Sequence, residues 1–445
     1  MDAPQPVPYR VAVPSARATL LTALVIISTF IALYAGLTIW NIIEVDFLVK
    51  LVYLFFMVDG VRMWIMLLIG ALFYRSFPAD PTYTPRVSVL IPAWNEEVGI
   101  QATIRSVLAN EYPNIEIIVI NDGSKDQTAE RVQAMVDQYP DKVKLITQTN
   151  GGKWSALNTG HEAATGEIMV CIDADSYLYP TAIRNVVKHY KNPRIDAVVG
   201  YVVIGNTKTL MGKLQYLEYL LGFHLKRTQH VMNTIHILSG AISSYRASVF
   251  KDHKLHYTGY SKTEDMDLSL QMRQKRLRLV HAHDAWCATE GASDIKGLIN
   301  QRVRWRYGGL LCYWTHRNLF FNFRMARKLG WYEFPNSMTG IFQIAIYPLI
   351  LGAAYLVPIA AGMPIFTLVA FCSMYVNFTI ILATSRHMRQ SVIPWLPLVT
   401  LFMYAAMLVE FVALFKAVNK IRQKKELQWT AWQRKGALDN PIQTA

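Results

Sequence analysis

The chain of 445 residues is 52% apolar, has a mean hydropathy of +0.20 and carries a net charge of +14. Only 17% of its residues are charged, against about 25% in an average soluble domain, which excludes both a disordered chain and an ordinary soluble enzyme. The positive charge fits nucleic acid, anionic lipid or a phosphorylated substrate, but no basic run interleaved with aromatics suggests nucleic-acid binding, so we favour basic membrane loops and diphosphate binding.

Two apolar segments come first in the chain. They run from residue 18 to 40 and from 51 to 74, and each is long enough, at about 20 residues, to cross a bilayer. We therefore predict two transmembrane helices within residues 18–74, preceded by a basic, cytoplasmic N-terminus at residues 1–17. The first segment lacks a small-residue cleavage site, so a cleavable signal peptide is not expected.

From residue 86 onward, short β-type runs alternate with helical patterns. The runs lie at 87–91, 115–120, 143–147 and 168–172, and polar loops follow them. This rhythm predicts an α/β domain over residues 86–294, Rossmann-like, with a mostly parallel, doubly wound sheet. Ligands of such sheets bind at the carboxyl ends of the strands.

Aromatic and basic residues mix in residues 295–330, which predicts amphipathic helices at a membrane surface. About three more transmembrane helices are predicted within residues 338–418, at about 338–359, 365–384 and 395–418, followed by a basic tail at 419–445. The basic N-terminus and the basic loop 385–390 place the α/β domain in the cytoplasm. Three simple crossings would put the basic tail outside, so we expect either an interfacial or re-entrant span or a tail that breaks the positive-inside rule.

Carboxylates follow two of the predicted strands. Asp122 stands in Asn-Asp-Gly-Ser after the run 115–120, and Asp173 and Asp175 follow the run 168–172. Two carboxylates separated by one residue can offer oxygens to a Mg²⁺ or Mn²⁺ ion that also holds a diphosphate. Asp122 can accept a hydrogen bond from a uracil N–H. Each motif alone also suits an ordinary turn, but their order along the chain favours function.

Two further residues flank the same edge of the sheet. Glu97 is a candidate nucleotide contact, and Lys153, after Gly-Gly, could neutralise phosphate or orient Asp122. A helix cap or an ordinary loop explains each of them nearly as well.

Thr263-Glu264-Asp265 opens a predicted helix and provides the candidate general base. Transfer with inversion needs one carboxylate near the acceptor hydroxyl, and we assign this role to Asp265, with Glu264 tuning its position or charge. Acidic residues at a helix start are the simpler alternative.

Gln301, Arg304 and Trp305 share one face of a predicted helix. A guanidinium can stabilise a departing diphosphate, and an indole offers a flat face to a sugar ring. The alternative is a membrane-interface helix, and both interpretations can hold together. Arg302 and Arg306 are expected to face lipid headgroups.

Cysteine and histidine spacing indicates neither a disulfide framework nor a metal centre. Cys171, Cys287, Cys312 and Cys372 are far apart and form no CxxC pair, which predicts a reducing compartment for the catalytic part. His281, His283 and Cys287 have no spacing typical of a closed metal site, so we assign them to the core or surface.

The ordered set of motifs resembles the processive family 2 glycosyltransferases, which include cellulose, chitin, hyaluronan and poly-N-acetylglucosamine synthases. The resemblance spans about residues 87–309. It implies a GT-A fold, a UDP-sugar donor, Mg²⁺ or Mn²⁺, and a polymer that leaves through a channel in the same polypeptide. By motif, it implies nucleotide-sugar contacts at Asp122, Asp173 and Asp175 (Asp175 also holding the metal), a base at Asp265, and acceptor or diphosphate contacts at Gly240, Gln301, Arg304 and Trp305. Glu97 and Lys153 are added to the nucleotide-sugar site from their position alone.

Within that family, the segments 212–215, 218–219, 226–229 and 301–305 look most like the bacterial poly-β-1,6-N-acetylglucosamine synthases. Those synthases usually carry a Pro-Glu-Thr element where residues 285–292 of this chain read Ala-Trp-Cys-Ala-Thr-Glu-Gly-Ala.

These patterns predict an inverting, processive, multi-pass enzyme of the inner or plasma membrane that polymerises a UDP-sugar, UDP-N-acetylglucosamine by best match, and moves the product outward. Its expected partners are the donor, the growing polysaccharide and membrane lipid, with room for a small membrane partner subunit. A non-processive transferase that passes one sugar to a lipid carrier, and a non-catalytic scaffold on the same fold, are the alternatives. The transferase to a lipid carrier does not need the motif from Gln301 to Trp305, so the presence of that motif argues against it. A non-catalytic scaffold would usually have lost Asp175, Asp265 and Arg304, so their presence argues against the scaffold.

Overall fold

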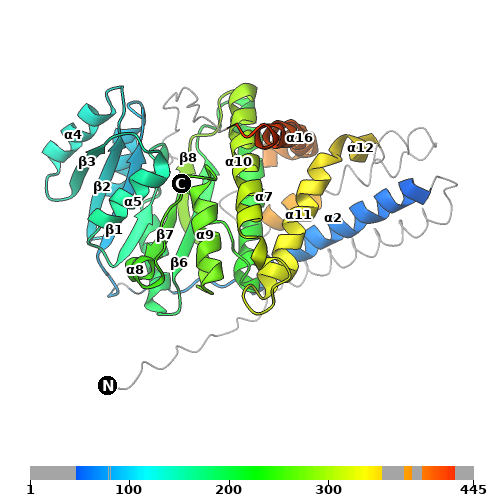
Figure 1. The fold of residues 1–445 in the computed structure, drawn as a ribbon, viewed down its shortest axis with the longest axis horizontal. Helices are drawn as coiled ribbons and strands as arrows, with labels where there is room; N and C mark the ends of the chain where they lie inside the picture. Colours follow the sequence, from blue (N-terminus) through cyan, green and yellow to red (C-terminus); the bar gives the residue numbers. More distant parts are fainter. Residues whose placement is uncertain (1–46, 79, 81, 353–374, 383–392, 426–445) are drawn as a thin grey trace, which may run out of the picture.

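A mixed sheet of eight strands forms the centre of the computed structural model, which describes residues 47–78, 80, 82–352, 375–382 and 393–425 (Figure 1). The strands lie side by side in the order β3-β2-β1-β4-β7-β6-β8-β5. Their bounds are β1 Val87–Ala93, β2 Ile115–Asp122, β3 Val143–Gln148, β4 Ile168–Cys171, β5 Ser176–Leu178, β6 Ala197–Ile204, β7 Ser243–Arg246 and β8 Leu279–Thr289.

The first four strands form the parallel part of the sheet. β1 pairs in parallel with both β2 and β4, and β2 pairs in parallel with β3. β1 and β4 are buried along their whole length, as strands covered on both faces must be. The four strands predicted from apolar runs are therefore confirmed, and their carboxyl ends lie along one edge.

The other half of the sheet departs from the doubly wound pattern. β7 runs antiparallel to β4 and β6, and β5 runs antiparallel to β8, whereas β6 and β8 are parallel. The sheet is thus mixed, with β5 and β7 opposed to the other strands. Ser243–Arg246 form β7, and residues 234–239 before it belong to neither a helix nor a strand.

Short helices flank the sheet, and α5 packs on β1 and β2 while α4 packs on β3. Their bounds are α3 Ile100–Leu108, α4 Thr128–Gln138, α5 Lys153–Ala163, α6 Ala182–Val187 with η1 Lys188–Lys191, α8 Ala247–His253 and α9 Glu264–Gln274.

Two long helices stand between the sheet and a group of apolar helices (Figure 1). They are α7 Leu210–Met232 and α10 Ile295–Thr315. Each begins at a side-chain cap, with Thr209 accepting from the Gly212 N–H and Asp294 from the Gly297 N–H. On their far side lie α2 Phe47–Phe73, α11 Phe334–Ala345, α12 Tyr347–Leu351, η6 Ile393–Leu398 and α16 Val399–Arg422. The turn between α10 and α11 holds η2 Arg317–Leu319, which packs against α9, and η3 Leu329–Glu333.

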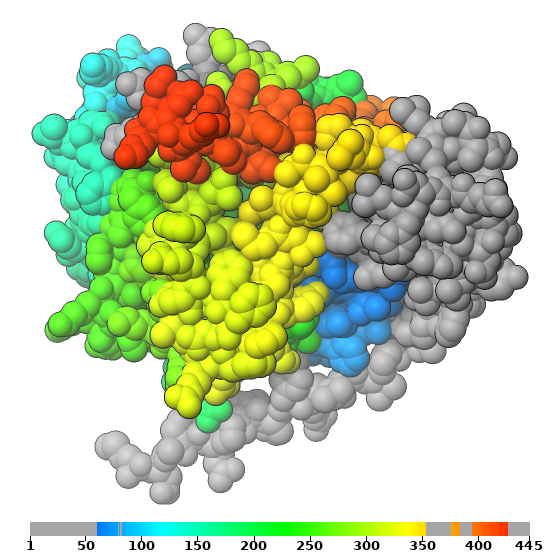
Figure 2. All heavy atoms as spheres, turned by 45° about the vertical axis from the view of Figure 1, so that its right-hand side comes forward, coloured from blue at the N-terminus to red at the C-terminus, as the bar shows by residue number. Residues whose placement is uncertain are grey.

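The apolar helices bear on the predicted membrane spans. Among the described residues, one helix, Pro394–Arg422, is long and apolar enough to cross a bilayer, and it corresponds to the last predicted span. Figure 2 shows this helix, in red and orange, lying against α11, in yellow. The span predicted at 51–74 coincides with α2, of which Gly60–Phe73 forms a shorter apolar helix by the same measure.

The remaining predicted spans lie partly or wholly outside the described residues. The span at 18–40 lies outside them, and only 375–382 of the span at 365–384 lies within them, in helical form. The span at 338–359 was expected as one helix, but α11 ends at Ala345 and α12 begins at Tyr347, with Pro348 in its first turn. Proline removes a backbone donor and clashes with the preceding turn, which explains the break.

Candidate active site

Asp122 ends β2 and binds the loop after β3 that contains Gly151 and Gly152, which we call the glycine loop. Its carboxylate, 2% exposed, accepts hydrogen bonds from Gln148 Nε2 (2.7 Å) and from the backbone N–H groups of Gly151 (2.9 Å) and Gly152 (2.8 Å). Gly123 has φ +69°, and a Cβ there would lie 2.8 Å from the Asn150 nitrogen. The loop after β3 can therefore approach the end of β2 closely only because residue 123 is glycine.

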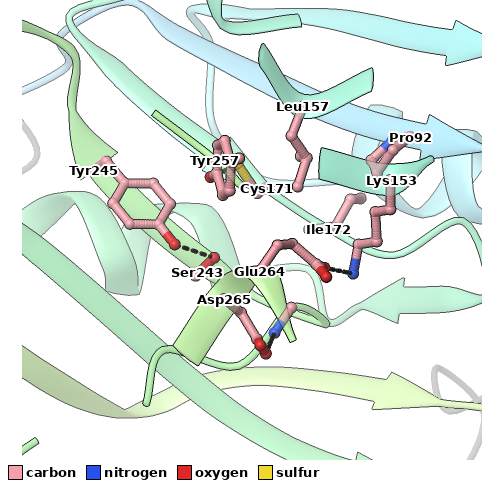
Figure 3. Close-up of a pocket in the computed structure, with 11 residues that line it drawn as sticks. Pro92, Lys153, Leu157, Cys171, Ile172, Ser243, Tyr245, Tyr257, Glu264 and Asp265 are labelled. Carbon is pink, nitrogen blue, oxygen red and sulfur yellow. Dashed lines mark hydrogen bonds and ion pairs between the residues drawn. The ribbon is translucent and has the colours of Figure 1, made fainter. Parts of the chain in front are cut away.

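Lys153, the first residue of α5, points to two carboxylates rather than to Asp122. Its Nζ lies 2.5 Å from Asp173 Oδ1 and 2.9 Å from Glu264 Oε1 (Figure 3 shows the second contact). Burial alone would lower the pKa of Lys153, but the charges of Asp173, Glu264 and Asp265 raise it above its ordinary value. The ammonium thus stays charged and joins the end of β4 to the start of α9.

Asp265 is held by backbone donors on both oxygens. Oδ2 accepts from the Gly240 N–H (3.1 Å) and Oδ1 from the Met266 N–H (2.8 Å). Burial, followed by the Glu264 charge, raises the pKa of Asp265 to about 6, against the opposing charges of Lys153 and Arg304. A carboxylate with a pKa near neutrality can accept a proton effectively at physiological pH.

Gly240 closes this arrangement from the loop before β7. A Cβ at residue 240 would lie 2.8 Å from Lys153 Nζ and 3.4 Å from Asp173 Oδ1. The absence of a side chain therefore lets this loop lie directly over the ion pair. We call the group formed by Lys153, Asp173, Gly240, Glu264 and Asp265 the carboxylate cluster.

A small cavity lies between the carboxylate cluster and the core (Figure 3). Its volume is about 10 Å³, which is about the room for one water molecule. It is lined on the core side by Pro92, Leu157, Cys171, Ile172, Ser243, Tyr245 and Tyr257. It is too small for a sugar or a nucleotide.

Asp173 and Asp175 have different surroundings although one residue separates them. Asp173 faces Lys153, whereas Asp175 is 6% exposed and its Oδ1 lies 3.3 Å from the hydroxyls of Ser176 and Thr289. Within the described part of the chain, no group of three or more His, Cys, Asp or Glu side chains could hold a metal. Oxygen donors around one carboxylate still fit Mg²⁺ or Mn²⁺, which are commonly held by one or two carboxylates together with substrate phosphates.

Glu97 supports the start of α4. Its Oε2 accepts from the Gln127 N–H (2.9 Å), and the Glu97 N–H donates to Asp126 Oδ2 (3.1 Å). These contacts match the helix-cap alternative for Glu97. They also join the loops that follow β1 and β2.

The three candidates on α10 lie close to the carboxylate cluster or to α7. Arg304 is near enough to lower the pKa of Asp265, and its Nη1 is 3.5 Å from the Lys262 carbonyl oxygen. The Trp305 ring lies 6.4 Å from that of Tyr219 on α7. Gln301 Oε1 is buried and has no hydrogen-bond partner among the described residues.

Arg302 and Arg306 do not face lipid headgroups, so that expectation was wrong. Arg302 is 3% exposed and pairs with Glu218 on α7 (2.5 Å) and Glu410 on α16 (3.3 Å), while Arg306 pairs with Glu410 (2.6 Å). The Arg302 guanidinium also lies 4.3 Å from the centre of the Trp305 ring. We call Glu218, Arg302, Arg306 and Glu410 the helix clamp.

Neither acid of the helix clamp was predicted to form a buried ion pair: Glu218 was noted only in a segment similar to the bacterial synthases, and Glu410 was not noted. A lone glutamate in the apolar run that became α16 was the available signal, because buried acids in such segments usually have a partner.

The histidines and cysteines considered above lie in the core. His281 and His283 belong to a buried aromatic group with Tyr74 and Tyr201. Cys171, Cys287 and Cys312 are buried free thiols, and Cys372 lies outside the described residues.

Comparison with known proteins finds a similar family over the first part of this site. Residues 88–254 match the family model described as glycosyl transferase family 2, which supports a glycosyltransferase. The match confirms the resemblance drawn from the motifs. It ends before Glu264, so it does not include α9 or α10.

Curated relatives agree with the bacterial subgroup suggested by the motifs. The chain is 35% identical over 230 residues to the poly-β-1,6-N-acetyl-D-glucosamine synthase of Staphylococcus epidermidis, and 33% identical to that of Staphylococcus aureus (strain COL). Each alignment covers 50% of this chain and 54% of the relative. The chain therefore spans about half the length of the curated relatives it matches.

A solved structure supports the fold. The mannosyltransferase PcManGT from Pyrobaculum calidifontis, in complex with GDP-Man and Mn²⁺, is similar with a TM-score of 0.53 over 92% of this chain and 99% of that chain. At 18% identity, this likeness shows a common GT-A-like fold and nothing about the substrate.

Proposed function

We propose that this protein is a membrane-embedded, inverting, processive glycosyltransferase. It polymerises a UDP-sugar, UDP-N-acetylglucosamine by best match, into a β-linked polysaccharide and moves the polymer across the membrane. The observation that carries the proposal is that Asp173, Gly240 and Asp265 lie together around Lys153. Arg304 lies near Asp265 and lowers the pKa of its carboxylate. This cluster combines a candidate base with positive groups suited to a diphosphate.

The donor is proposed to bind along the ends of β2 and β4. Asp122 contacts the uracil N–H, since each carboxylate oxygen can accept more than one hydrogen bond, while the glycine loop fixes its orientation. Glu97 and Lys153 complete the nucleotide-sugar site. Asp175, with Asp173 nearby, would hold Mg²⁺ or Mn²⁺, which when bound would neutralise the charge of the diphosphate.

Asp265 acts as the general base in this proposal. It takes the proton of the acceptor hydroxyl as the hydroxyl oxygen forms a bond to the anomeric carbon and the bond from that carbon to the UDP oxygen breaks. The electron pair leaves with UDP, and Arg304 stabilises the charge that develops there. The backbone donors on Asp265 support this role because they hold the carboxylate in one orientation.

The acceptor is proposed to lie against α10 and Gly240. Trp305 would offer its ring face to the terminal sugar, and Gln301, whose Oε1 is buried without a partner among the described residues, would bind an acceptor hydroxyl. The apolar helices beyond α7 and α10 support a membrane path for the product, as does the helix Pro394–Arg422. A small membrane subunit could complete that path.

The direct test is turnover by purified full-length protein in detergent with Mg²⁺. Radiolabelled UDP-glucose and UDP-N-acetylglucosamine are offered separately, and the product is sized. The proposal expects a long polymer from UDP-N-acetylglucosamine. A single sugar transferred to lipid would instead establish the non-processive alternative, and polymer from UDP-glucose alone would correct the donor.

A further inference from the structure

A second cavity lies outside the carboxylate cluster, at the C-terminal end of α7. It has a volume of about 360 Å³, which is within the range of small-molecule sites. It is lined by Val231, Met232, Asn233, Arg273, Arg276, Met325, Ala326, Arg327 and Lys328, which come from α7, α9 and the turn before α11. We call it the basic cavity, because four of its lining residues are cationic and none is acidic.

One cationic side chain of the basic cavity, Arg273, is buried and hydrogen-bonded to the surrounding chain. Arg273 is 7% exposed, and its Nη1 donates to Asn233 Oδ1 (3.1 Å) and the Leu277 carbonyl (3.3 Å). Burial, followed by the charge of Arg278, lowers the pKa of Arg273 to about 10, and Glu333 opposes this shift. Glu333 is itself bonded to Gln229 and Thr234, so Arg273 lacks a direct carboxylate partner among the described residues.

The other cations are exposed around the opening. Arg276, Arg327 and Lys328 form no ion pair within the part of the chain that the structure describes. Several unpaired positive groups around one concave site repel each other, and an anion that contacts them together relieves that repulsion. The chemistry of the basic cavity therefore selects an anionic group with several oxygens, such as a phosphate ester.

Exposed aromatic side chains lie beside the basic cavity on the same turn. Phe321, Phe323 and Trp331 are exposed, Phe323 to 63%, and the rings of Phe323 and Trp331 stack at 4.2 Å. Basic residues next to exposed aromatics are typical of a surface that meets lipid headgroups.

The basic cavity also lies close to the C-terminal end of α2, because both adjoin the last two turns of α7. Gly70, in the last turn of α2, packs against Thr228 of α7, one turn before Val231. Tyr332, which follows the turn, donates from its hydroxyl to Met66 Sδ (2.8 Å). Figure 1 shows the yellow turn before α11 at the lower end of α7, beside the end of α2.

We propose that the basic cavity binds the phosphate-bearing headgroup of an anionic membrane lipid. The inference rests on the membrane placement in the proposed function, but not on transferase activity. The acyl chains would lie along the exposed aromatics, and Arg273 would anchor the headgroup phosphate. The site would fix the height of α7 and α9 relative to the bilayer.

The test measures lipid retained by the purified full chain in nonionic detergent. The protein is equilibrated with micelles containing phosphatidylglycerol and phosphatidylcholine in varied ratios, separated by size exclusion, and its bound lipid is quantified by mass spectrometry. We expect selective retention of phosphatidylglycerol. Arg276→Asn with Arg327→Asn should weaken that retention about 30-fold, since each basic residue near a headgroup contributes about fivefold and the two factors multiply.

Asparagine suits both substitutions because residues 276 and 327 have positive φ values of 61° and 46°. The matched control is Lys275→Gln with Arg324→Gln, which removes the same charge from exposed residues that do not line the basic cavity. The control should retain phosphatidylglycerol as the wild type does. Should the double variant unfold, Lys328→Gln provides a milder change with the same expected direction.

Three results would overturn the inference. The first is equal retention of the two lipids by the wild type. The second is an equal loss of phosphatidylglycerol retention in the cavity variant and in its control. The third is full displacement of phosphatidylglycerol by millimolar inorganic phosphate at constant ionic strength. The last result would assign the basic cavity to a soluble anion, because a headgroup anchored by acyl chains resists such competition. Polymer synthesis is measured separately, so failure of the lipid site and failure of the proposed function are distinguishable.

Discussion

The carboxylate cluster and the helix clamp use the same chemical groups in opposite ways. In the carboxylate cluster, acids outnumber the cation, and the pKa of Asp265 is raised to about 6. In the helix clamp, Arg302 and Arg306 balance Glu218 and Glu410 one for one. The carboxylate cluster has excess negative charge that can accept a proton or interact with a ligand. The helix clamp neutralises its charges internally and joins α7, α10 and α16.

The comparison predicts that changes in the two groups affect different properties. Neutralising the surplus acid Asp265 in the carboxylate cluster should reduce turnover with little effect on folding, because the acids there outnumber Lys153. Substitutions in the helix clamp should reduce stability, because breaking one partner of a buried ion pair leaves a charge without compensation.

The largest effect is expected for Asp265→Asn. Removing a general base typically costs about 10²- to 10⁴-fold in rate, and binding of the UDP-sugar should survive because the base does not hold the donor. Turnover and donor binding are measured on the same preparation. Polymer formation at a near-normal rate would show that Asp265 is not the base.

Chelation should also remove activity. If Asp175 holds Mg²⁺ or Mn²⁺ together with the diphosphate, excess EDTA should reduce turnover at least about 10²-fold, and either ion should restore it. The measurement is turnover before and after metal is added back. Persistent activity in excess EDTA would remove Asp175 as a metal ligand.

In the helix clamp, Arg302→Met should lower the free energy of unfolding by about 3–5 kcal/mol, because Glu218 loses its ion-pair partner and Glu410 keeps only Arg306. Thermal unfolding in detergent provides the measurement. Adding Glu218→Gln should recover part of the loss, because it removes the charge left without a partner while Glu410 keeps its pair with Arg306. A stable Arg302→Met protein would mean that the helix clamp contributes little.

Trp305→Ala should shorten the product more than it weakens donor binding. Stacking of a sugar on the indole face would be lost, while the groups at β2 and β4 stay in place. Product length by gel electrophoresis and donor affinity are compared. Unchanged chain length would exclude the acceptor-stacking role.

The smallest effect concerns pH. A base must be deprotonated to act, so kcat/KM should fall about tenfold for each pH unit below a midpoint near 6 and level off above it. Arg304 lowers the pKa of Asp265, so Arg304→Gln should move that midpoint upward. An unchanged midpoint would mean that the acidic limb belongs to another group.

Much of the site could be predicted because local patterns determine it. Asp122 and Asp173 were placed from the apolar runs before them, and a parallel strand delivers its next residue to the same edge as its neighbours. The prediction that Arg302 faces lipid headgroups was wrong, because helical spacing shows which residues share a face but not which other helices cover that face. The break between α11 and α12 was missed although Pro348 signals it, because the apolar run continues on both sides.

By itself, the sequence determined the parallel strands, the motif order and the family resemblance, since these depend on short-range periodicity and on residue types at fixed spacing. Only the tertiary structure decided that Lys153 turns from Asp122 to Asp173 and Glu264, that Gly240 covers this ion pair, and that α7, α10 and α16 are joined through buried charges. Those contacts link residues far apart in the chain, and their energies depend on burial and on neighbouring charges that exist only once the chain has folded.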